Sequence, residues 1–259
     1  MEEKLELRVY GDPSLRALVY LPGLHGDWTI IGGFRAAVAG RVRFVEMTYP
    51  RTLTWSLDDY AAAIEEELSK LGITHGWLLG ESFGSQPMWK LIANGKFRAQ
   101  GAVLAGGFVR YPAQWFMQLL EKATGHGLSV LLVKIMFGYA RFARYRYRRS
   151  PQTLATLDEF LARRRRPQDR EAAEHRLQLV DGNDPRKIAM TAQIPIFGLT
   201  GILDPIVPWP ATRRWLKRNC PALRDYKIVR RADHNVLSTG TKESAKWILE
   251  WMDKFTIDD

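Results

Sequence analysis

The chain contains a single cysteine, Cys220, among its 259 residues. One thiol can form neither an internal disulfide nor a thiolate metal site, so a disulfide framework and a zinc–cysteine cluster are excluded. A lone cysteine is typical of a reducing compartment, and we expect a cytoplasmic protein. The opening residues, Met1–Glu6, are acidic and polar. They lack the apolar stretch of a signal peptide.

Long apolar runs, internal repeats and low-complexity linkers are also missing from the sequence. The most apolar stretch, residues 128–140, is too short to cross a bilayer and contains Lys134. Hydrophobic residues make up 46% of the chain and aromatic residues 11%, which is typical of a globular rather than a disordered protein. The length suits one large α/β domain, or one such domain with an insertion.

Acidic residues are scarce in one part of the chain only. The net charge is +10, and residues 108–190 hold 16 lysines and arginines against 8 acidic residues. The rest of the chain is nearly balanced, with 22 basic and 20 acidic residues. The basic excess therefore belongs to one segment, which needs its own explanation.

Apolar patterns predict an alternation of strands and helices that this basic segment interrupts. Residues 17–21 and 101–105 are continuous apolar runs, typical of strands buried on both faces. Repeated strand-then-helix units predict a mostly parallel sheet with helices on both faces. We therefore expect an α/β core formed by residues 1–107 and 191–259, with residues 108–190 as a basic, helical cap insertion. Such an insertion would lie over the carboxyl ends of the strands, where functional residues of open α/β sheets gather.

The most informative motif is Gly80-Glu81-Ser82-Phe83-Gly84. It follows the apolar run Trp77–Leu79 and precedes a helix expected to begin near Ser85. A G-x-S-x-G sequence between a strand and a helix is the setting of a nucleophile elbow, in which the serine lies on a strained turn. Side chains at either glycine would collide with the neighbouring strand or helix. The motif predicts Ser82 as a nucleophile.

A serine hydroxyl needs a base, usually a histidine that a carboxylate orients. His234 directly follows the last predicted strand, and Asp204 follows the strand before it. Both therefore belong at the same sheet edge as Ser82. Asp233 adjoins the histidine and would point elsewhere from an extended backbone, and Asp225 is expected to precede its strand. The sequence thus predicts a triad of Ser82, Asp204 and His234.

Acyl transfer also needs N–H donors for the negatively charged oxygen of the tetrahedral intermediate. The residue after the nucleophile, Phe83, supplies the first. The second is expected from the loop after residues 18–21, where Pro22-Gly23 makes Leu24 the donor. A shifted alignment on His25-Gly26 would make Asp27 the donor instead.

Together these motifs resemble the α/β-hydrolase superfamily, and specifically serine esterases and lipases with a helical cap. The resemblance covers residues from about 16 to 252 outside the insertion, which matches no cap known to us. The chain departs from the superfamily's pattern at Pro22, where a histidine is common. The segments that carry the resemblance are Leu21–Gly26, Gly80–Gly84, Gly201–Pro208 and Asp233-His234.

The resemblance implies a metal-free, cofactor-free serine hydrolase that cleaves a carboxylic ester or thioester through an acyl-enzyme. A thioesterase or acyltransferase acting on an anionic acyl carrier is an alternative, as is a non-catalytic binding protein on the same fold. Trp28, Phe108 and Trp209 lie near the site loops in sequence and, with Phe83, are candidates to line an apolar acyl pocket. Core packing is the competing explanation for each of them.

The arginines of the insertion have two explanations. Arg141, Arg144 and Arg148 would share one helix face, and Arg163–Arg166 form a second cluster. They either make a solvated face that covers the site or recruit an anionic partner. A membrane surface, which would make the protein peripheral to the membrane, and an acidic acyl carrier both fit. Nucleic acid is not expected, because no binding motif accompanies the arginines.

Overall fold

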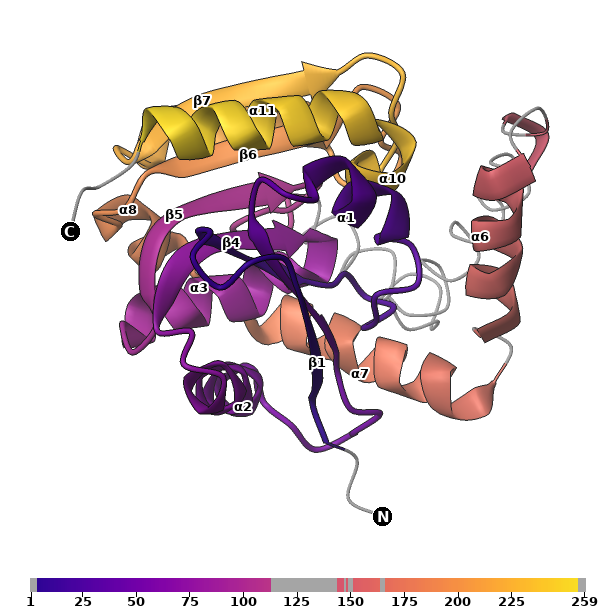
Figure 1. Ribbon diagram of the computed structural model, residues 1–259, viewed down its shortest axis with the longest axis horizontal. Helices are drawn as coiled ribbons and strands as arrows, with labels where there is room; N and C mark the ends of the chain where they lie inside the picture. Colours follow the sequence, from indigo (N-terminus) through magenta and orange to yellow (C-terminus); the bar gives the residue numbers. More distant parts are fainter. Residues whose placement is uncertain (1–3, 113–143, 147, 149–150, 164–165, 256–259) are drawn as a thin grey trace, which may run out of the picture.

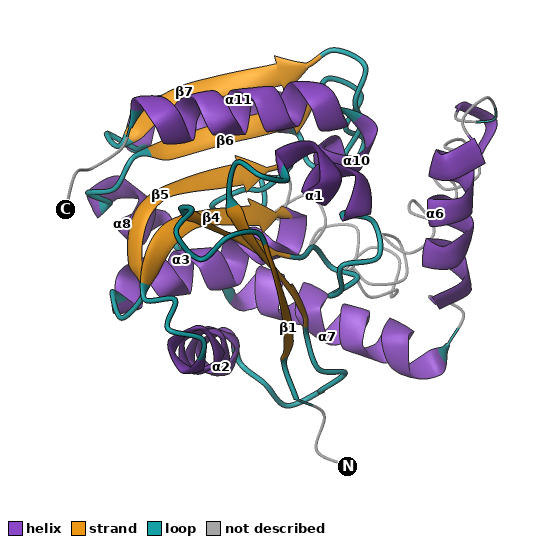
Figure 2. Ribbon diagram, in the orientation of Figure 1, coloured by secondary structure: helices purple, strands orange, loops and turns teal. Residues whose placement is uncertain are grey.

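A computed structural model describes residues 4–112, 144–146, 148, 151–163 and 166–255. The described residues form a seven-stranded sheet in the order β1-β3-β2-β4-β5-β6-β7 (Figures 1 and 2). Strand β1 pairs antiparallel with β3, and every other pair is parallel. The mostly parallel sheet predicted from the sequence is confirmed. Its strands are β1 (Glu6–Tyr10), β2 (Ala17–Leu21), β3 (Arg43–Thr48), β4 (His75–Glu81), β5 (Arg98–Ala105), β6 (Ile196–Gly201) and β7 (Leu223–Val229).

Helices cover both faces of this sheet, and each face has its own apolar core. One core packs Phe34, Ile248 and Trp251 against the sheet, and the other packs Tyr60, Trp89 and Leu216. The first face carries α1 (Gly32–Val38), α10 (Val236–Thr239) and α11 (Thr241–Lys254), and the second carries α2 (Leu57–Lys70), α3 (Ser85–Asn94), α8 (Arg186–Thr191) and α9 (Trp209–Asn219).

Helix α2 shows how the sequence fixes an element. The hydroxyl of Ser56 accepts a hydrogen bond from the backbone N–H of Asp59, and the Asp59 carboxylate accepts one from the Ser56 N–H. This capping box satisfies N–H groups that the first turn leaves unpaired. Tyr60, Ile64 and Leu68 then recur at helical spacing and are all buried.

One predicted boundary is wrong. Asp225 lies inside β7 rather than before it, because β7 begins at Leu223. Its carboxylate accepts a hydrogen bond from Trp251 Nε1 at 3.0 Å and thus ties the edge strand to α11. Asp225 therefore helps to hold α11 against the edge strand β7.

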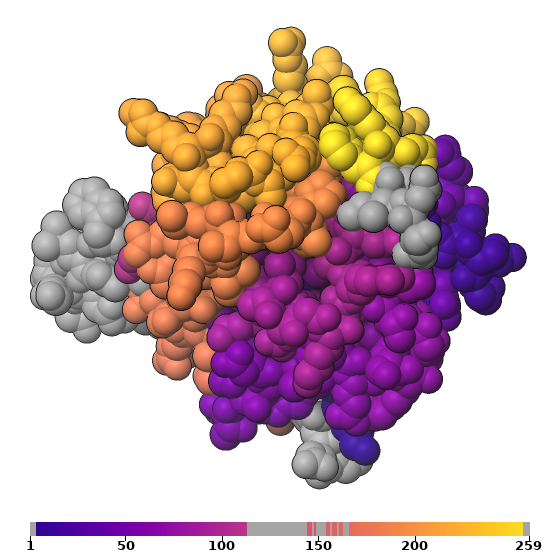
Figure 3. All heavy atoms as spheres, turned by 90° about the vertical axis from the view of Figure 1, so that its left-hand side faces the viewer, coloured from indigo at the N-terminus to yellow at the C-terminus, as the bar shows by residue number. Residues whose placement is uncertain are grey.

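Between β5 and β6 the structure describes two further helices, α6 (Pro151–Arg163) and α7 (Pro167–Gly182). Helix α7 extends from the core toward α6, which stands apart from the sheet beyond the tips of its strands (Figure 1). Figure 3 views the molecule from the end away from α6, where residues of the C-terminal part of the chain lie above residues of its first half. The division into a core and a 108–190 cap stays a prediction. No described helix is long and apolar enough to cross a membrane.

Candidate active site

Ser82 lies immediately after β4 on a sharply bent backbone. Its φ of 51° is the only positive value for a non-glycine residue in the described part of the chain. A Cβ atom at Gly84 would lie 2.1 Å from the carbonyl oxygen of Leu21, and one at Gly80 would lie 2.9 Å from Ser85 Cα. Both positions thus require glycine, and together they lift the serine above the sheet edge.

Ser82, His234 and Asp204 form one hydrogen-bonded chain. Ser82 Oγ lies 2.9 Å from His234 Nε2, and His234 Nδ1 lies 2.9 Å from Asp204 Oδ2. A carboxylate only accepts, so Nδ1 carries the proton and donates a hydrogen bond to Asp204, which leaves Nε2 free to accept from the serine hydroxyl. The imidazole and carboxylate are nearly inaccessible to solvent. The structure thus brings together the three residues predicted as the triad.

Asp204 is held by its own loop. Its second oxygen, Oδ1, accepts hydrogen bonds from the backbone N–H groups of Ile206 at 2.8 Å and Val207 at 3.0 Å. This side-chain-to-backbone turn is a common use of aspartate after a strand. Because Oδ1 is occupied, Oδ2 is the oxygen that faces His234.

The two loops that carry Asp204 and His234 are in close contact. The N–H of Leu203 donates to the carbonyl oxygen of Ala232 at 3.1 Å. A Cβ atom at Gly201 would lie 2.2 Å from the carbonyl oxygen of Asp233. A glycine at the end of β6 therefore lets the histidine loop approach the aspartate.

A buried carboxyl group that sequence reasoning did not single out lies beside the triad. Glu81 precedes the serine and accepts a hydrogen bond from the Tyr20 hydroxyl at 2.5 Å. Burial raises the pKa of Glu81 to about 7, although the Tyr20 bond and the charge of His234 lower it. The alternation of β4 was the available signal, because it puts Glu81 on the same sheet face as Trp77 and Leu79.

The charges around His234 set its basicity. Burial lowers the pKa of the imidazole, but the charge of Asp204 and the hydrogen bond that His234 donates to it raise the pKa. Glu81 and Asp233 add smaller contributions in the same direction, and the net effect is a pKa above the ordinary 6.5. The base is thus neutral only above that raised value.

The loop that follows β2 adjoins the serine. A Cβ atom at Gly23 would lie 3.4 Å from Ser82 Cβ, and Leu24 is the next residue along the chain. No acceptor among the described residues contacts the N–H of Leu24. Asp27, the alternative donor, accepts a hydrogen bond from the Thr29 N–H at 2.7 Å. Phe83 is buried directly after Ser82.

The three predicted pocket residues occupy different surroundings. Trp28 packs beneath the Arg8 guanidinium, 3.8 Å from it, and against the core on the α11 face. Phe108 is buried beside α3, and its ring centroid lies 5.6 Å from that of Tyr111. Trp209 donates from Nε1 to the Ile202 carbonyl oxygen at 3.3 Å. No hydrogen bond or ring contact joins any of the three to Ser82 in the described part of the chain.

Sequence reasoning also missed Arg176, which lies in the predicted cap on α7. The residue is buried, with a relative exposure of 2%, and its side chain donates to the loop that adjoins Ser82. An arginine in an arginine-rich segment is expected to be solvated, so nothing in the local pattern marked it. The apolar residues Leu179 and Val180 of the same helix pack against the core.

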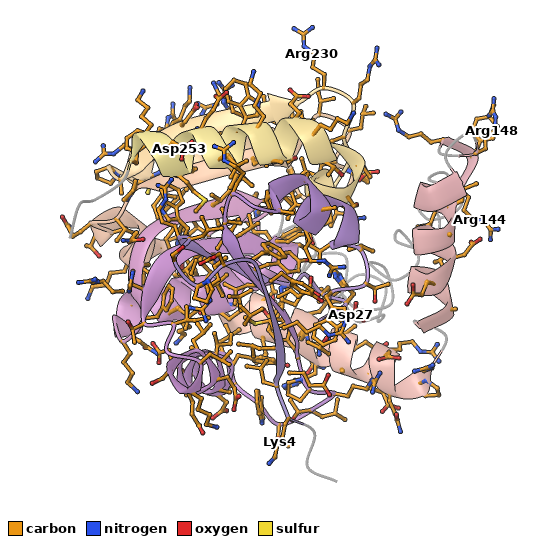
Figure 4. The ribbon with its side chains drawn as sticks, in the orientation of Figure 1. Lys4, Asp27, Arg144, Arg148, Arg230 and Asp253 are labelled. Atoms are coloured by element: carbon orange, nitrogen blue, oxygen red, sulfur yellow. The ribbon has the colours of Figure 1, made fainter. Side chains whose placement is uncertain are left out.

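The other arginines of the segment behave as exposed side chains where the structure describes them. Arg144 pairs with Asp158 at 3.3 Å, and Arg148 lies over the Tyr145 ring. Figure 4 shows Arg144 and Arg148 pointing away from the sheet. Arg141 lies outside the described residues, and an anionic partner stays a prediction.

Comparison with known proteins identifies the fold. No protein-family model matches the sequence, and neither does any curated protein. Among solved structures, the enol-lactonase of Burkholderia xenovorans LB400 is similar at a TM-score of 0.75 and 18% identity, with 96% of each chain covered. A thermophilic esterase from Thermogutta terrifontis has a TM-score of 0.75 at 15% identity, with 98% of this chain and 94% of that chain covered. These likenesses show the α/β-hydrolase fold.

Proposed function

We propose that this chain of the α/β-hydrolase fold is a serine hydrolase that cleaves carboxylic esters or thioesters. The observation that carries the proposal is the hydrogen-bonded chain from Ser82 through His234 to Asp204. It lies at the carboxyl ends of β4, β6 and β7, where three separate loops converge. The strained φ of Ser82 supports the same function, because strain at a nucleophile exposes its hydroxyl to the base.

The chemistry follows from this geometry. Ser82 Oγ attacks the acyl carbon while His234 Nε2 takes the hydroxyl proton, and the carbonyl oxygen becomes negatively charged. The N–H groups of Phe83 and Leu24 are the proposed donors to that oxygen. The bond to the leaving alcohol or thiol then breaks, and His234 gives that group the proton.

Water completes the cycle by the same route. His234 takes a proton from water, the resulting hydroxide attacks the acyl-enzyme, and Ser82 Oγ leaves with the proton that His234 returns. Asp204 stabilises the imidazolium at both stages and keeps the proton on Nδ1. An acceptor other than water in this second half would make the protein an acyltransferase.

The kinds of enzyme among the similar structures support an ester substrate. They include an esterase, an enol-lactonase and an N-acyl homoserine lactonase, whose substrates contain an acyl–oxygen bond. Their identity to this chain is only 15 to 18%, so they suggest a class of bond rather than a particular substrate.

The first test is hydrolysis of p-nitrophenyl esters of increasing acyl length by the wild type and Ser82→Ala. We expect turnover in the wild type, a loss of roughly 10⁴-fold or more in Ser82→Ala, and no change in Ser69→Ala, an exposed serine of α2. The preferred acyl length then measures the pocket. Thioesters and amine or alcohol acceptors extend the series.

Labelling with a fluorophosphonate separates the enzyme from a non-catalytic protein on the same fold. We expect one phosphonyl group per chain, attached to Ser82 and absent from Ser82→Ala by mass spectrometry. A folded wild-type chain that neither reacts with the probe nor hydrolyses any ester would refute the proposed function.

A further inference from the structure

Arg176 uses all three nitrogens of its buried guanidinium. Nη1 donates to the carbonyl oxygen of Leu24 at 3.0 Å, and Nη2 donates to that of Pro50 at 3.0 Å. Nε donates to the hydroxyl of Tyr60 at 3.4 Å. The planar fork thus joins α7 to the loops after β2 and β3 and to the first turn of α2.

The burial of this charge is expensive. Among the described residues no carboxylate forms an ion pair with Arg176, so neutral oxygens alone compensate for the lost water. An apolar side chain would join a helix to a core at lower cost. The contacts that the guanidinium makes are therefore informative about its role.

The first of these contacts fixes the loop of the proposed oxyanion donor. The Leu24 carbonyl belongs to the same residue as the proposed donor N–H, so a hydrogen bond to it restrains the backbone of the loop that carries this N–H. Gly26 allows the guanidinium to lie against the loop, because a Cβ atom there would lie 2.6 Å from Arg176 Cζ. The loop is also closed by a bond from the Gly26 N–H to the Gly23 carbonyl at 2.9 Å.

Arg176 is linked to the second proposed donor, the Phe83 N–H, through two tyrosines. Phe83 packs edge-on against Tyr49 and Tyr60, with ring centroids 6.0 and 5.9 Å away. Arg176 donates to the Tyr60 hydroxyl and lies 5.6 Å from the centroid of the Tyr49 ring. One guanidinium therefore contacts both rings that hold the Phe83 side chain, and with it the backbone turn that carries the Phe83 N–H.

We propose that Arg176 is a positioning residue that holds the Leu24 and Phe83 N–H groups in the arrangement that binds the oxyanion. This inference rests on the proposed hydrolase function. Arg176 acts through Leu24, Tyr49 and Tyr60 rather than on the substrate. Its removal should therefore weaken stabilisation of the transition state more than binding of the substrate.

The competing explanation is that α7 merely needs any anchor to the core. The neighbouring residue offers a matched control, because His175 Nε2 lies 2.8 Å from the carbonyl oxygen of Trp55. This contact also joins α7 to the loop after β3 but touches neither proposed donor. His175→Gln replaces the ring that makes this anchor of the helix and leaves Arg176 in place.

The experiment compares Arg176→Gln, Arg176→Lys and His175→Gln with the wild type on a p-nitrophenyl ester. The kcat values are normalised to the fraction of Ser82 that a fluorophosphonate labels at completion, so that unfolded molecules do not count. For Arg176→Gln we expect kcat to fall about 10- to 100-fold, with KM changed less than about 3-fold. The kcat of Arg176→Lys should lie between those of the wild type and Arg176→Gln, because an ammonium group cannot reproduce the hydrogen bonds of the planar guanidinium.

A trifluoromethyl ketone, whose adduct with Ser82 carries the oxyanion, supplies the second readout. Its inhibition constant should rise in Arg176→Gln by the same factor by which kcat/KM falls, and should be unchanged in His175→Gln. A structural anchor alone would lower the melting temperature of all these variants and leave the normalised kcat and the inhibition constant as in the wild type.

The outcomes separate the two proposals. An active wild type whose Arg176 variants match His175→Gln overturns the positioning role while the hydrolase function stands. If neither Arg176 variant gives a cooperative unfolding transition, Arg176 is a folding residue and the positioning role is rejected. An inactive, unlabelled wild type overturns the proposed function itself and the inference with it.

Discussion

The two sides of Ser82 are built in different ways. On one side, Asp204 is held by the N–H groups of Ile206 and Val207, two and three residues away. On the other, the loop of Leu24 is held by Arg176, which is 152 residues away along the chain. The acid–base side is organised by its own turns, whereas the oxyanion side depends on a helix from the predicted cap.

This difference teaches which parts of the site tolerate change. A self-contained turn keeps its geometry when distant segments move, because its hydrogen bonds lie within a few residues. A loop held from outside is only as well placed as the element that holds it. We therefore expect the geometry of the acid–base side to be lost only when residues of its own turns are substituted. The geometry of the oxyanion side should be lost when residues of α7, or the residues that α7 contacts, are substituted.

The largest expected effect is on the acid–base side. Asp204→Asn should lower kcat roughly 10³- to 10⁴-fold, because an amide favours the wrong tautomer of His234. Asp233→Asn is the control, since the Asp233 carboxylate accepts from the Asn235 N–H and the Thr239 hydroxyl. Stopped-time ester assays should show that kcat falls less than about tenfold in Asp233→Asn. Equal losses in the two variants would remove Asp204 from its proposed role.

The next effect tests the oxyanion side through the loop itself. Gly26→Ala introduces a methyl group 2.6 Å from Arg176 Cζ at a φ of +76°. Gly72→Ala is the matched control, with a φ of +68° and open space around the new methyl group. In denaturant titrations we expect the free energy of unfolding to fall by about 1 kcal/mol in Gly72→Ala. In Gly26→Ala we expect it to fall by about 1–3 kcal/mol more than in Gly72→Ala.

Activity should separate these two glycine variants more sharply than stability does. We expect kcat to fall about tenfold or more in Gly26→Ala, because the guanidinium is displaced from Leu24, and to stay at the wild-type value in Gly72→Ala. The same activity in both variants would show that the loop does not need Arg176 against it.

The smallest effect is a shift in pH dependence caused by Glu81. His234 must be neutral to act as the base, so kcat/KM should rise with pH through its raised pKa. Glu81→Gln removes a carboxylate that helps to raise this pKa, so the acidic limb should move to lower pH. We expect a shift of less than about one pH unit, since Asp204 contributes more. An unmoved or alkaline-shifted limb would contradict the coupling.

Stability should respond to the same substitution with a defined sign. The pKa of Glu81 is raised from 4.5 to about 7 in the folded protein, so the folded state favours the protonated carboxyl. Its contribution to stability is full below about pH 4.5 and is lost as the pH rises through 7. In denaturant titrations Glu81→Gln should flatten the dependence of unfolding free energy on pH across this window.

The sequence predicts well what is encoded locally. Ser82, Asp204 and His234 each follow a strand whose apolar run is visible, and parallel strands bring their carboxyl ends to one edge. The glycines of the elbow were visible for the same reason. In each case a residue type and its immediate neighbours determine the geometry.

The contacts that sequence reasoning missed join distant segments. Arg176 belongs to a run of charged residues, and only the folded α7 shows that it is buried while Arg144 and Arg148 are exposed. Glu81 occupies the variable position of a motif, and its burial depends on Tyr20 across the sheet. The alternation of β4 places Glu81 on a buried face, but no pattern in either segment identifies its partner, because neither residue type is unusual in its own surroundings.

The distance between Leu24 and Arg176 also has a consequence for protein synthesis. A ribosome adds about 5 to 20 residues per second, so the 152 residues between them correspond to roughly 8 to 30 s of translation. His234 follows Ser82 by the same interval of 152 residues. During that time the growing chain carries its nucleophile without its base and its Leu24 loop without its anchor. On the proposed function, a chain that is still being made therefore cannot attack an ester until His234 has been added.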